Sequence, residues 1–148
     1  MRTLVLFTLL SGFALCDAQA RAEGTDRCSL TDEQFLQQLT TMKSWPEIHA
    51  VYKRNLPACA DDGVYGEGYT EVVVVALARR WSELGELQRF ANRDPAFRRF
   101  VYHHIDASAD EGDLRKVANN ARTMCPPNAR PLCDEIATRA DAAIGVLK

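Results

Sequence analysis

The sequence contains none of the compact motifs that usually identify an enzyme or a metal site. No Cys-x-x-Cys pair, Glu-x-x-His spacing or Gly-x-Ser-x-Gly elbow occurs in its 148 residues. The chain also has little excess charge of either sign, with 18 basic and 20 acidic residues. Because nucleic-acid binding needs a clear basic excess, this balance argues against DNA or RNA as a partner.

The chain lacks a hydrophobic run long enough to cross a membrane. Its main apolar run covers residues 4–15, only twelve positions, whereas a spanning helix needs about 20. The run follows a cationic start at Arg2 and precedes Ala18-Gln19-Ala20, which has small residues where a signal peptidase reads. We therefore predict a cleavable secretory signal over residues 1–20 and one mature domain over residues 21–148.

Whether the mature chain is soluble or attached to a membrane depends on Cys16, the first cysteine of the full sequence. Lipidation of Cys16 would tether the chain to a membrane, but Leu15 precedes it where lipid attachment usually requires Gly, Ala or Ser. We interpret Cys16 as lost with the signal, so the mature domain is expected to be soluble and periplasmic, with secretion as the alternative. Cleavage removes one base and one acid, and the net charge stays at −2.

Four cysteines remain after cleavage: Cys28, Cys59, Cys125 and Cys133. Three pairings are possible, and the spacing favours Cys28–Cys59 and Cys125–Cys133, because each pair then brackets a predicted helical hairpin or a tight turn. A zinc site is the alternative, but an oxidising compartment favours disulfides. We predict two disulfides, no metal and no cofactor.

Nearly every segment of the mature chain has the pattern of a helix. Thr31 with Gln34, and Ser44 with Glu47, have the spacing of helix-capping boxes. The run of valines at residues 72–75 suggests a strand. However, apolar residues recur at helical spacing through this region, and we predict a buried helix that continues to residue 81. The residues on this stripe are Tyr69, Val72, Val73, Ala76 and Leu77.

The second half of the chain shows a further series of helix starts. Polar caps precede apolar residues repeated at helical spacing, and Asp94 is followed by a proline suited to the first helical turn. The predicted starts are Ser82, Asp94, Ser108 or Asp110, and about Arg130. Seven helices joined by short turns predict an all-α domain of stacked antiparallel hairpins. A similarity between residues 87–92 and 114–119 suggests a short, curved helical-repeat bundle.

Candidate catalytic and metal-binding residues are few. His103 and His104 are neighbours, but adjacent helical residues point about 100° apart, so the two rings are poorly placed to hold one ion. We interpret His104 as a core residue and His103 as a surface residue. Asp61-Asp62-Gly63 resembles the start of a calcium loop, but the alternating carboxylates that follow in such loops are missing.

The segment from residue 60 to residue 70 differs in composition from the rest. It contains three glycines, two tyrosines and three acids in eleven residues. Glycines allow unusual backbone conformations and tyrosines offer large contact areas, and both are common in binding loops. The alternative is the start of a helix whose glycines allow close packing. The side chains that we predict to contact a partner are Asp61, Asp62, Tyr65, Glu67 and Tyr69.

One local pattern resembles a known family. Cys59 followed by Gly68-Tyr69-Thr70-Glu71-Val72 forms an approximate cysteine, Gly-Tyr and helix pattern. Together with the export signal, the small helical domain and two disulfides, it resembles the periplasmic immunity proteins of type VI secretion amidase effectors. Members of that family are helical, often dimeric, and block a cell-wall amidase by filling its active-site cleft.

The resemblance implies that the chain is not an enzyme. It implies that the partner is a secreted peptidoglycan-cleaving amidase whose active site the chain occludes. A homodimer is also consistent with the resemblance. The alternative is a general periplasmic adaptor or chaperone-like module that presents a concave helical face to several partners. A third hypothesis is an enzyme that uses His103, His104 or Asp106.

Overall fold

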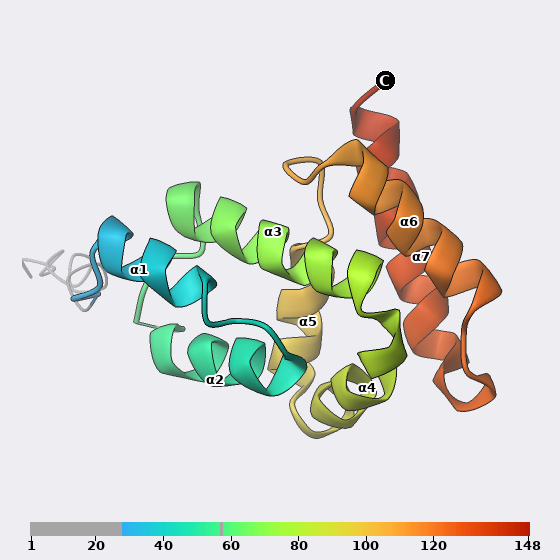
Figure 1. The fold of residues 1–148 in the computed structure, drawn as a ribbon, viewed down its shortest axis with the longest axis horizontal. Coiled ribbons are helices and arrows are strands. Elements are labelled where there is room, and N and C mark those ends of the chain that lie inside the picture. The colour runs from blue at the N-terminus through green and yellow to red at the C-terminus, as the bar shows by residue number, and fades with distance from the viewer. Residues whose placement is uncertain (1–27, 57) are drawn as a thin grey trace, which may run out of the picture.

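The computed structural model describes residues 28–56 and 58–148, and within them it is all helical (Figure 1). The predicted signal peptide and Cys16 lie outside these residues. Seven α-helices and two short 3-10 helices are present in the described part. They are α1 (Asp32–Leu39), α2 (Trp45–Asn55), α3 (Gly63–Arg79), η1 (Trp81–Glu83), α4 (Leu84–Arg93), α5 (Pro95–His103), α6 (Glu111–Thr123), η2 (Pro127–Ala129) and α7 (Arg130–Val146).

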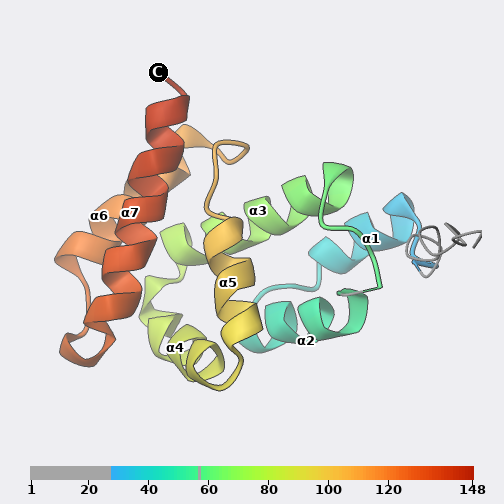
Figure 2. The same ribbon diagram turned by 180° about the vertical axis from the view of Figure 1, so that it is seen from behind.

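The long helix α3 lies at the centre of the arrangement (Figures 1 and 2). Helices α1 and α2 pack beside it, and α6 packs against it from another side. Helices α6 and α7 form an antiparallel hairpin near the end of α3, and α4 pairs with α5. The prediction of an all-α fold stapled by disulfides is confirmed by this arrangement and by the bonds Cys28–Cys59 and Cys125–Cys133.

The helix starts follow the capping residues that the sequence predicts. Thr31 and Gln34 form a complete capping box, in which each side chain bonds the other residue's backbone. The Ser44 hydroxyl accepts from the backbone N–H of Glu47. Asp94 accepts from two backbone N–H groups at the start of α5, where Pro95 occupies the first helical position. These caps satisfy N–H groups that have no partner within the helix.

Two predicted helix boundaries are wrong in detail. Ser82 does not cap α4, because residues 81–83 form a 3-10 turn and α4 begins after it. The preceding helix ends at Arg79 and does not continue to Trp81. The Trp81 indole N–H donates to the backbone oxygen of Met124 over 2.9 Å, which ties this turn to the end of α6. A long-range contact of this kind cannot be read from local sequence.

For the helix that follows α5, the sequence offers Ser108 or Asp110 as the start. Asp110 is the residue that caps this helix, α6.

The apolar residues that the sequence places on inward faces form one core. The valine run at residues 72–75 lies within α3, which confirms the helix prediction, and Val73 and Leu77 of this helix are buried. Leu114 of α6 and Ile136 of α7 are also fully buried. The predicted disulfides Cys28–Cys59 and Cys125–Cys133 are both formed. No helix in the described part is long and apolar enough to cross a membrane.

Candidate functional site

The segment predicted as a binding loop is mostly the start of α3. The helix begins at Gly63, whose φ of +51° is a conformation that suits glycine. Gly68 lies against the Phe35 ring of α1. A Cβ at this position would come within 2.6 Å of Phe35 Cε1 and 2.9 Å of Leu39 Cδ1. The alternative prediction, a helix start whose glycine allows close packing, is therefore the correct one at Gly68.

The two tyrosines of the segment point inward. Tyr69 is 1% exposed and packs edge-on against Phe35 and Phe100. The prediction that its side chain contacts a partner is wrong, because the helical repeat places it in the core. Tyr65 is half-buried, and its hydroxyl donates to the backbone oxygen of Leu30 over 2.6 Å. It joins α3 to the segment that precedes α1.

The three predicted acids lie at the surface or near it. Asp62 and Glu67 are exposed, and the Asp61 side chain is 28% exposed. Asp62 is the N-cap of α3, yet its side chain makes no capping hydrogen bond. Among the described residues, neither Asp62 nor Glu67 takes part in an ion pair. Within the described part of the chain, these two carboxylates are therefore available to bind another molecule.

Asp61 belongs to a polar cluster around the buried His104. The imidazole Nδ1 lies 3.1 Å from the hydroxyl of Thr70, which donates to Asp106 over 3.1 Å. On the other side, Nε2 lies 3.2 Å from Oδ1 of Asp61, although the two atoms are not aligned as a hydrogen bond. His104 and Thr70 are each 1% exposed. An acid, a histidine and a hydroxyl thus lie next to one another, but the histidine and the hydroxyl are closed to solvent in this conformation.

The cluster joins α3 to the segment that precedes it and to the segment between α5 and α6. The Asp106 carboxylate also accepts hydrogen bonds from the backbone and hydroxyl of Ser108, both at 2.7 Å. Burial raises the pKa of Asp106, but the hydrogen bonds from Ser108 and Thr70 outweigh it, so the pKa lies below its ordinary value. We interpret the cluster as a structural link, in which Asp106 is held as an anion.

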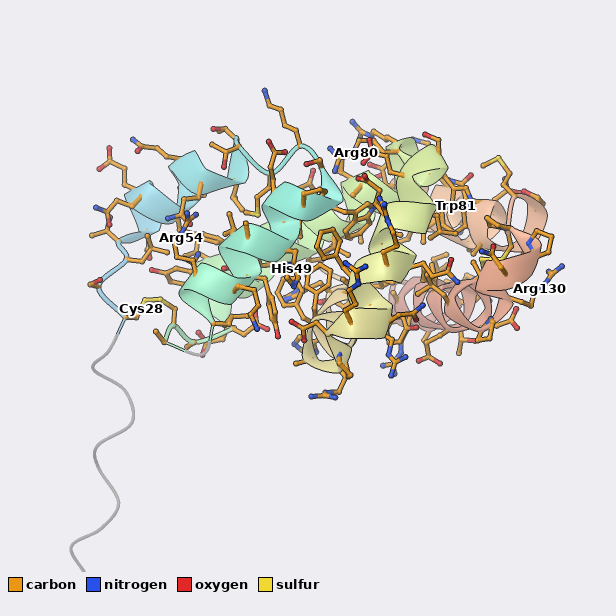
Figure 3. All side chains as sticks on the ribbon, turned by 90° about the horizontal axis from the view of Figure 1, so that it is seen from below. Cys28, His49, Arg54, Arg80, Trp81 and Arg130 are labelled. Carbon is orange, nitrogen blue, oxygen red and sulfur yellow. A yellow bond between two sulfur atoms is a disulfide. The ribbon has the colours of Figure 1, made fainter. Side chains whose placement is uncertain are left out.

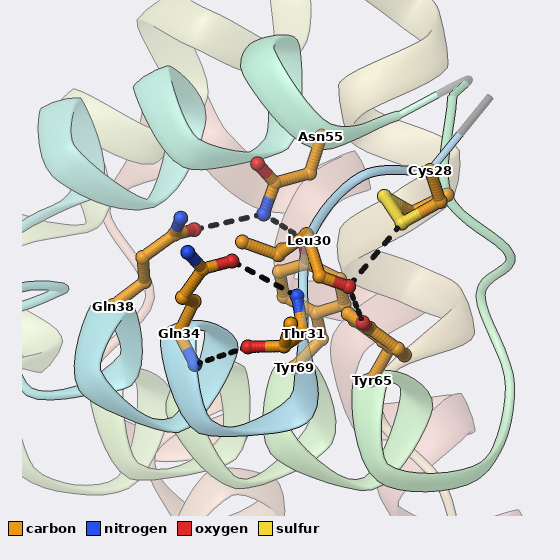
Figure 4. The surroundings of a disulfide bond; sticks show 9 residues. Cys28, Leu30, Thr31, Gln34, Gln38, Asn55, Tyr65 and Tyr69 are labelled. Atoms are coloured by element: carbon orange, nitrogen blue, oxygen red, sulfur yellow. Dashed lines mark hydrogen bonds between the residues drawn. A yellow bond between two sulfur atoms is a disulfide. The ribbon is translucent and has the colours of Figure 1, made fainter.

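A polar pocket of about 570 Å³ lies between α1 and α2, beside the Cys28–Cys59 disulfide. Figure 3 shows Arg54 extending from α2 towards α1. Around the same disulfide, Gln34 and Gln38 face Asn55 across the gap between the helices (Figure 4). The polar residues of the wall are Ser29, Gln34, Gln37, Gln38, Thr41, Arg54 and Asn55.

Asn55 is the buried centre of this wall. Its side chain is almost fully buried, and its amide nitrogen donates to Gln38 Oε1 over 2.9 Å and to the Tyr69 hydroxyl over 3.0 Å. Burial raises the pKa of Tyr69, whereas the Asn55 hydrogen bond and the positive charge of Arg54 lower it, and the net shift is upward.

The sequence analysis did not identify this pocket. From the sequence alone, three glutamines, Gln34, Gln37 and Gln38, have the pattern of surface residues on an amphipathic helix. Arg54 has the pattern of a basic residue in the last turn of a helix. The one available signal is Asn55, because a polar residue followed by apolar Leu56 at a helix end is consistent with an inward amide. The pairing of α1 with α2 depends on tertiary packing.

Within residues 28–56 and 58–148, no group of three or more His, Cys, Asp or Glu side chains is placed to hold a metal ion. Comparison of the chain with protein-family models, with curated proteins and with solved structures finds no match in any of the three. Any function for the sites described above must therefore be argued from their own chemistry.

Proposed function

We propose that this chain is an exported inhibitory protein that binds a peptidoglycan-cleaving amidase in the periplasm and occludes its active site. The observation that carries the proposal is that the carboxylates of Asp62 and Glu67, at the N-cap and in the first turns of α3, are exposed and form no ion pair with the described residues. The resemblance of the segment from Cys59 to Val72 to amidase immunity proteins supports the same surface. Export by residues 1–20 is part of this proposal.

Rigidity at this end of the molecule suits an inhibitor. The Cys28–Cys59 disulfide anchors the segment just before α3, and Tyr65 ties the first turns of the helix to Leu30. Gly68 allows the same helix to pack directly on Phe35. Because these contacts exist before binding, little ordering entropy is lost when a partner binds. The acidic end complements a cleft lined by cations or N–H donors.

The first test is capture of partners with the mature chain, disulfides intact, from cells that produce it. Support requires that a captured protein cleaves purified peptidoglycan and that one equivalent of the chain stops the cleavage. Failure to capture a peptidoglycan hydrolase, or capture of one that stays active with excess chain, would contradict the proposal. Several unrelated partners would favour the adaptor alternative.

A pair of matched variants tests the surface. Asp62→Asn combined with Glu67→Gln removes two negative charges from the start of α3, and Glu33→Gln combined with Asp134→Asn removes one each from exposed positions of α1 and α7. We expect the first pair to weaken inhibition about tenfold or more, since charge-assisted contacts are lost. The second pair has the same net charge and should leave inhibition unchanged. Equal behaviour of the two pairs would exclude this surface.

A further inference from the structure

The pocket between α1 and α2 has the size and the lining of a ligand site. Its volume of about 570 Å³ falls within the range of about 300 to 1,000 Å³ that is typical of small-molecule pockets. Leu30, Ala58 and Cys59 give it an apolar side, and the amides of α1 and α2 give it a polar side. The Cys28–Cys59 disulfide fixes one rim.

The charged lining of the pocket is positive. Among the described residues, Arg54 is the only charged residue that lines it, and no carboxylate does. In the described part of the chain, Arg54 forms no ion pair and no hydrogen bond to another side chain, unlike Arg79, which pairs with Asp113. A guanidinium next to a pocket and without a carboxylate partner favours an anionic ligand.

The amides around Arg54 present donors. The Gln34 oxygen accepts from the backbone N–H of Thr31 over 3.0 Å, and because that N–H can only donate, the amide orientation of Gln34 is fixed. The Gln38 oxygen accepts from Asn55. Both carbonyl oxygens are thus occupied, and the two NH₂ groups, which donate to no described residue, are available for a ligand. Asn55 holds Gln38 from a position that is only 5% exposed, so part of the wall is preformed.

We propose that this pocket binds the C-terminal carboxylate of a short peptide. Arg54 pairs with the carboxylate, and the NH₂ groups of Gln34 and Gln38 donate to the carboxylate and to peptide carbonyls. One cation matches a singly charged group better than a phosphate, which carries close to two charges at neutral pH. The apolar side of the pocket, at Leu30 and Ala58, lies against a small side chain of the peptide.

The test compares two small probes on the full mature chain. N-acetyl-alanyl-alanine carries the free carboxylate, and its C-terminal amide is otherwise identical. We expect the free acid to bind and to shift the NMR signals of the side-chain amides of Gln34 and Gln38. The amide should bind about tenfold more weakly or worse, because a charge-assisted contact is lost. No binding of the acid at millimolar concentration, or equal binding of both probes, would overturn the proposal.

Arg54→Gln tests the cation directly. This exposed side chain has no partner in the described residues, so the variant should keep its helical signal and its unfolding midpoint. We expect about a tenfold loss of affinity for the acid, with the amide unaffected. Arg130→Gln, which changes an exposed arginine outside the pocket, is the matched control and should bind as the unmodified chain does. Unchanged affinity of Arg54→Gln would overturn the assignment.

Inorganic phosphate is the third probe. Competition by phosphate at lower concentration than the peptide acid would show a general anion site and overturn the peptide assignment. This pocket does not depend on the proposed inhibition of an amidase. Peptide binding without capture of a hydrolase would support the pocket proposal and contradict the inhibitor proposal. Capture of an inhibited hydrolase without peptide binding would support the inhibitor proposal and contradict the pocket proposal.

Discussion

Asn55 donates its side-chain amide to the phenol oxygen of Tyr69 over 3.0 Å, and the contact joins the end of α2 to the first half of α3. The same amide donates to Gln38 of α1. One buried side chain thus connects three helices at the bottom of the polar pocket. Buried networks of this kind stabilise when every member has a partner and become costly when one partner is removed.

Tyr69→Phe removes the phenol oxygen and leaves the aromatic ring in place. We expect the free energy of unfolding to fall by about 1 kcal/mol, the usual net value of a buried hydrogen bond. Urea unfolding followed by circular dichroism measures the change. Tyr102→Phe is the matched control, since Tyr102 is half-buried and its hydroxyl bonds no described residue. A loss as large for Tyr102→Phe would show that the Asn55 contact is not the cause.

Gly68→Ala should destabilise the fold by about 1 to 3 kcal/mol, the usual cost of overpacking a core. The new Cβ would lie 2.6 Å from Phe35 Cε1, so α1 and α3 must separate or the ring must turn. Gly145→Ala is the control in α7, where an added Cβ meets no atom within 4 Å. Because alanine favours a helix over glycine, that variant should be stabilised by up to about 1 kcal/mol. Thermal unfolding distinguishes the two directions. A neutral Gly68→Ala would show that α1 moves freely.

The sequence predicts the helices well because their signals are local. Caps at Thr31 and Asp94, and apolar stripes at helical spacing, depend only on neighbours along the chain. The inward position of His104 follows from the same spacing and is confirmed. The export signal, the amidase partner and the adaptor alternative stay predictions.

The site is harder to predict because it depends on which helices meet. The glycines and tyrosines in the first turns of α3 have the composition of a binding loop, but Tyr69 and Gly68 serve the contact with Phe35. Composition alone cannot separate these roles. The pocket of Arg54 and Gln34 exists only because α1 lies beside α2, and that arrangement follows from long-range packing and the Cys28–Cys59 link.

Removal of the two disulfides should have unequal effects. Cys28 and Cys59 are 31 residues apart, and Cys125 and Cys133 are 8 apart. In the chain-entropy model the longer loop gains more, by about 1 kcal/mol. We expect Cys28→Ala with Cys59→Ala to lower the urea midpoint more than Cys125→Ala with Cys133→Ala. The reverse order would show that packing around the fully buried Cys133 outweighs loop entropy.

Because the pKa of Asp113 is lowered in the folded state, we expect the free energy of unfolding to fall when this carboxylate is protonated in acid. Its carboxylate accepts from Lys116 over 2.7 Å, and Arg79 donates to its other oxygen over the same distance. The Lys116 hydrogen bond is the largest cause of a lowered pKa, burial opposes it, and Arg79 adds to the lowering. The folded state therefore favours the ionised carboxylate. Its contribution is complete above the ordinary aspartate pKa of about 4 and is lost as the pH falls through the lower folded value.

Asp113→Asn should therefore cost about 1 to 3 kcal/mol at pH 7, where two charge-assisted hydrogen bonds are lost. The difference from the unmodified chain should shrink below about pH 4 as Asp113 itself becomes neutral. Urea unfolding across this pH range measures both quantities. Asp134→Asn, at an exposed position without an ion pair in the described residues, should show almost no difference at either pH. A cost for Asp113→Asn that stays constant with pH would mean that the shape of the side chain matters and its charge does not.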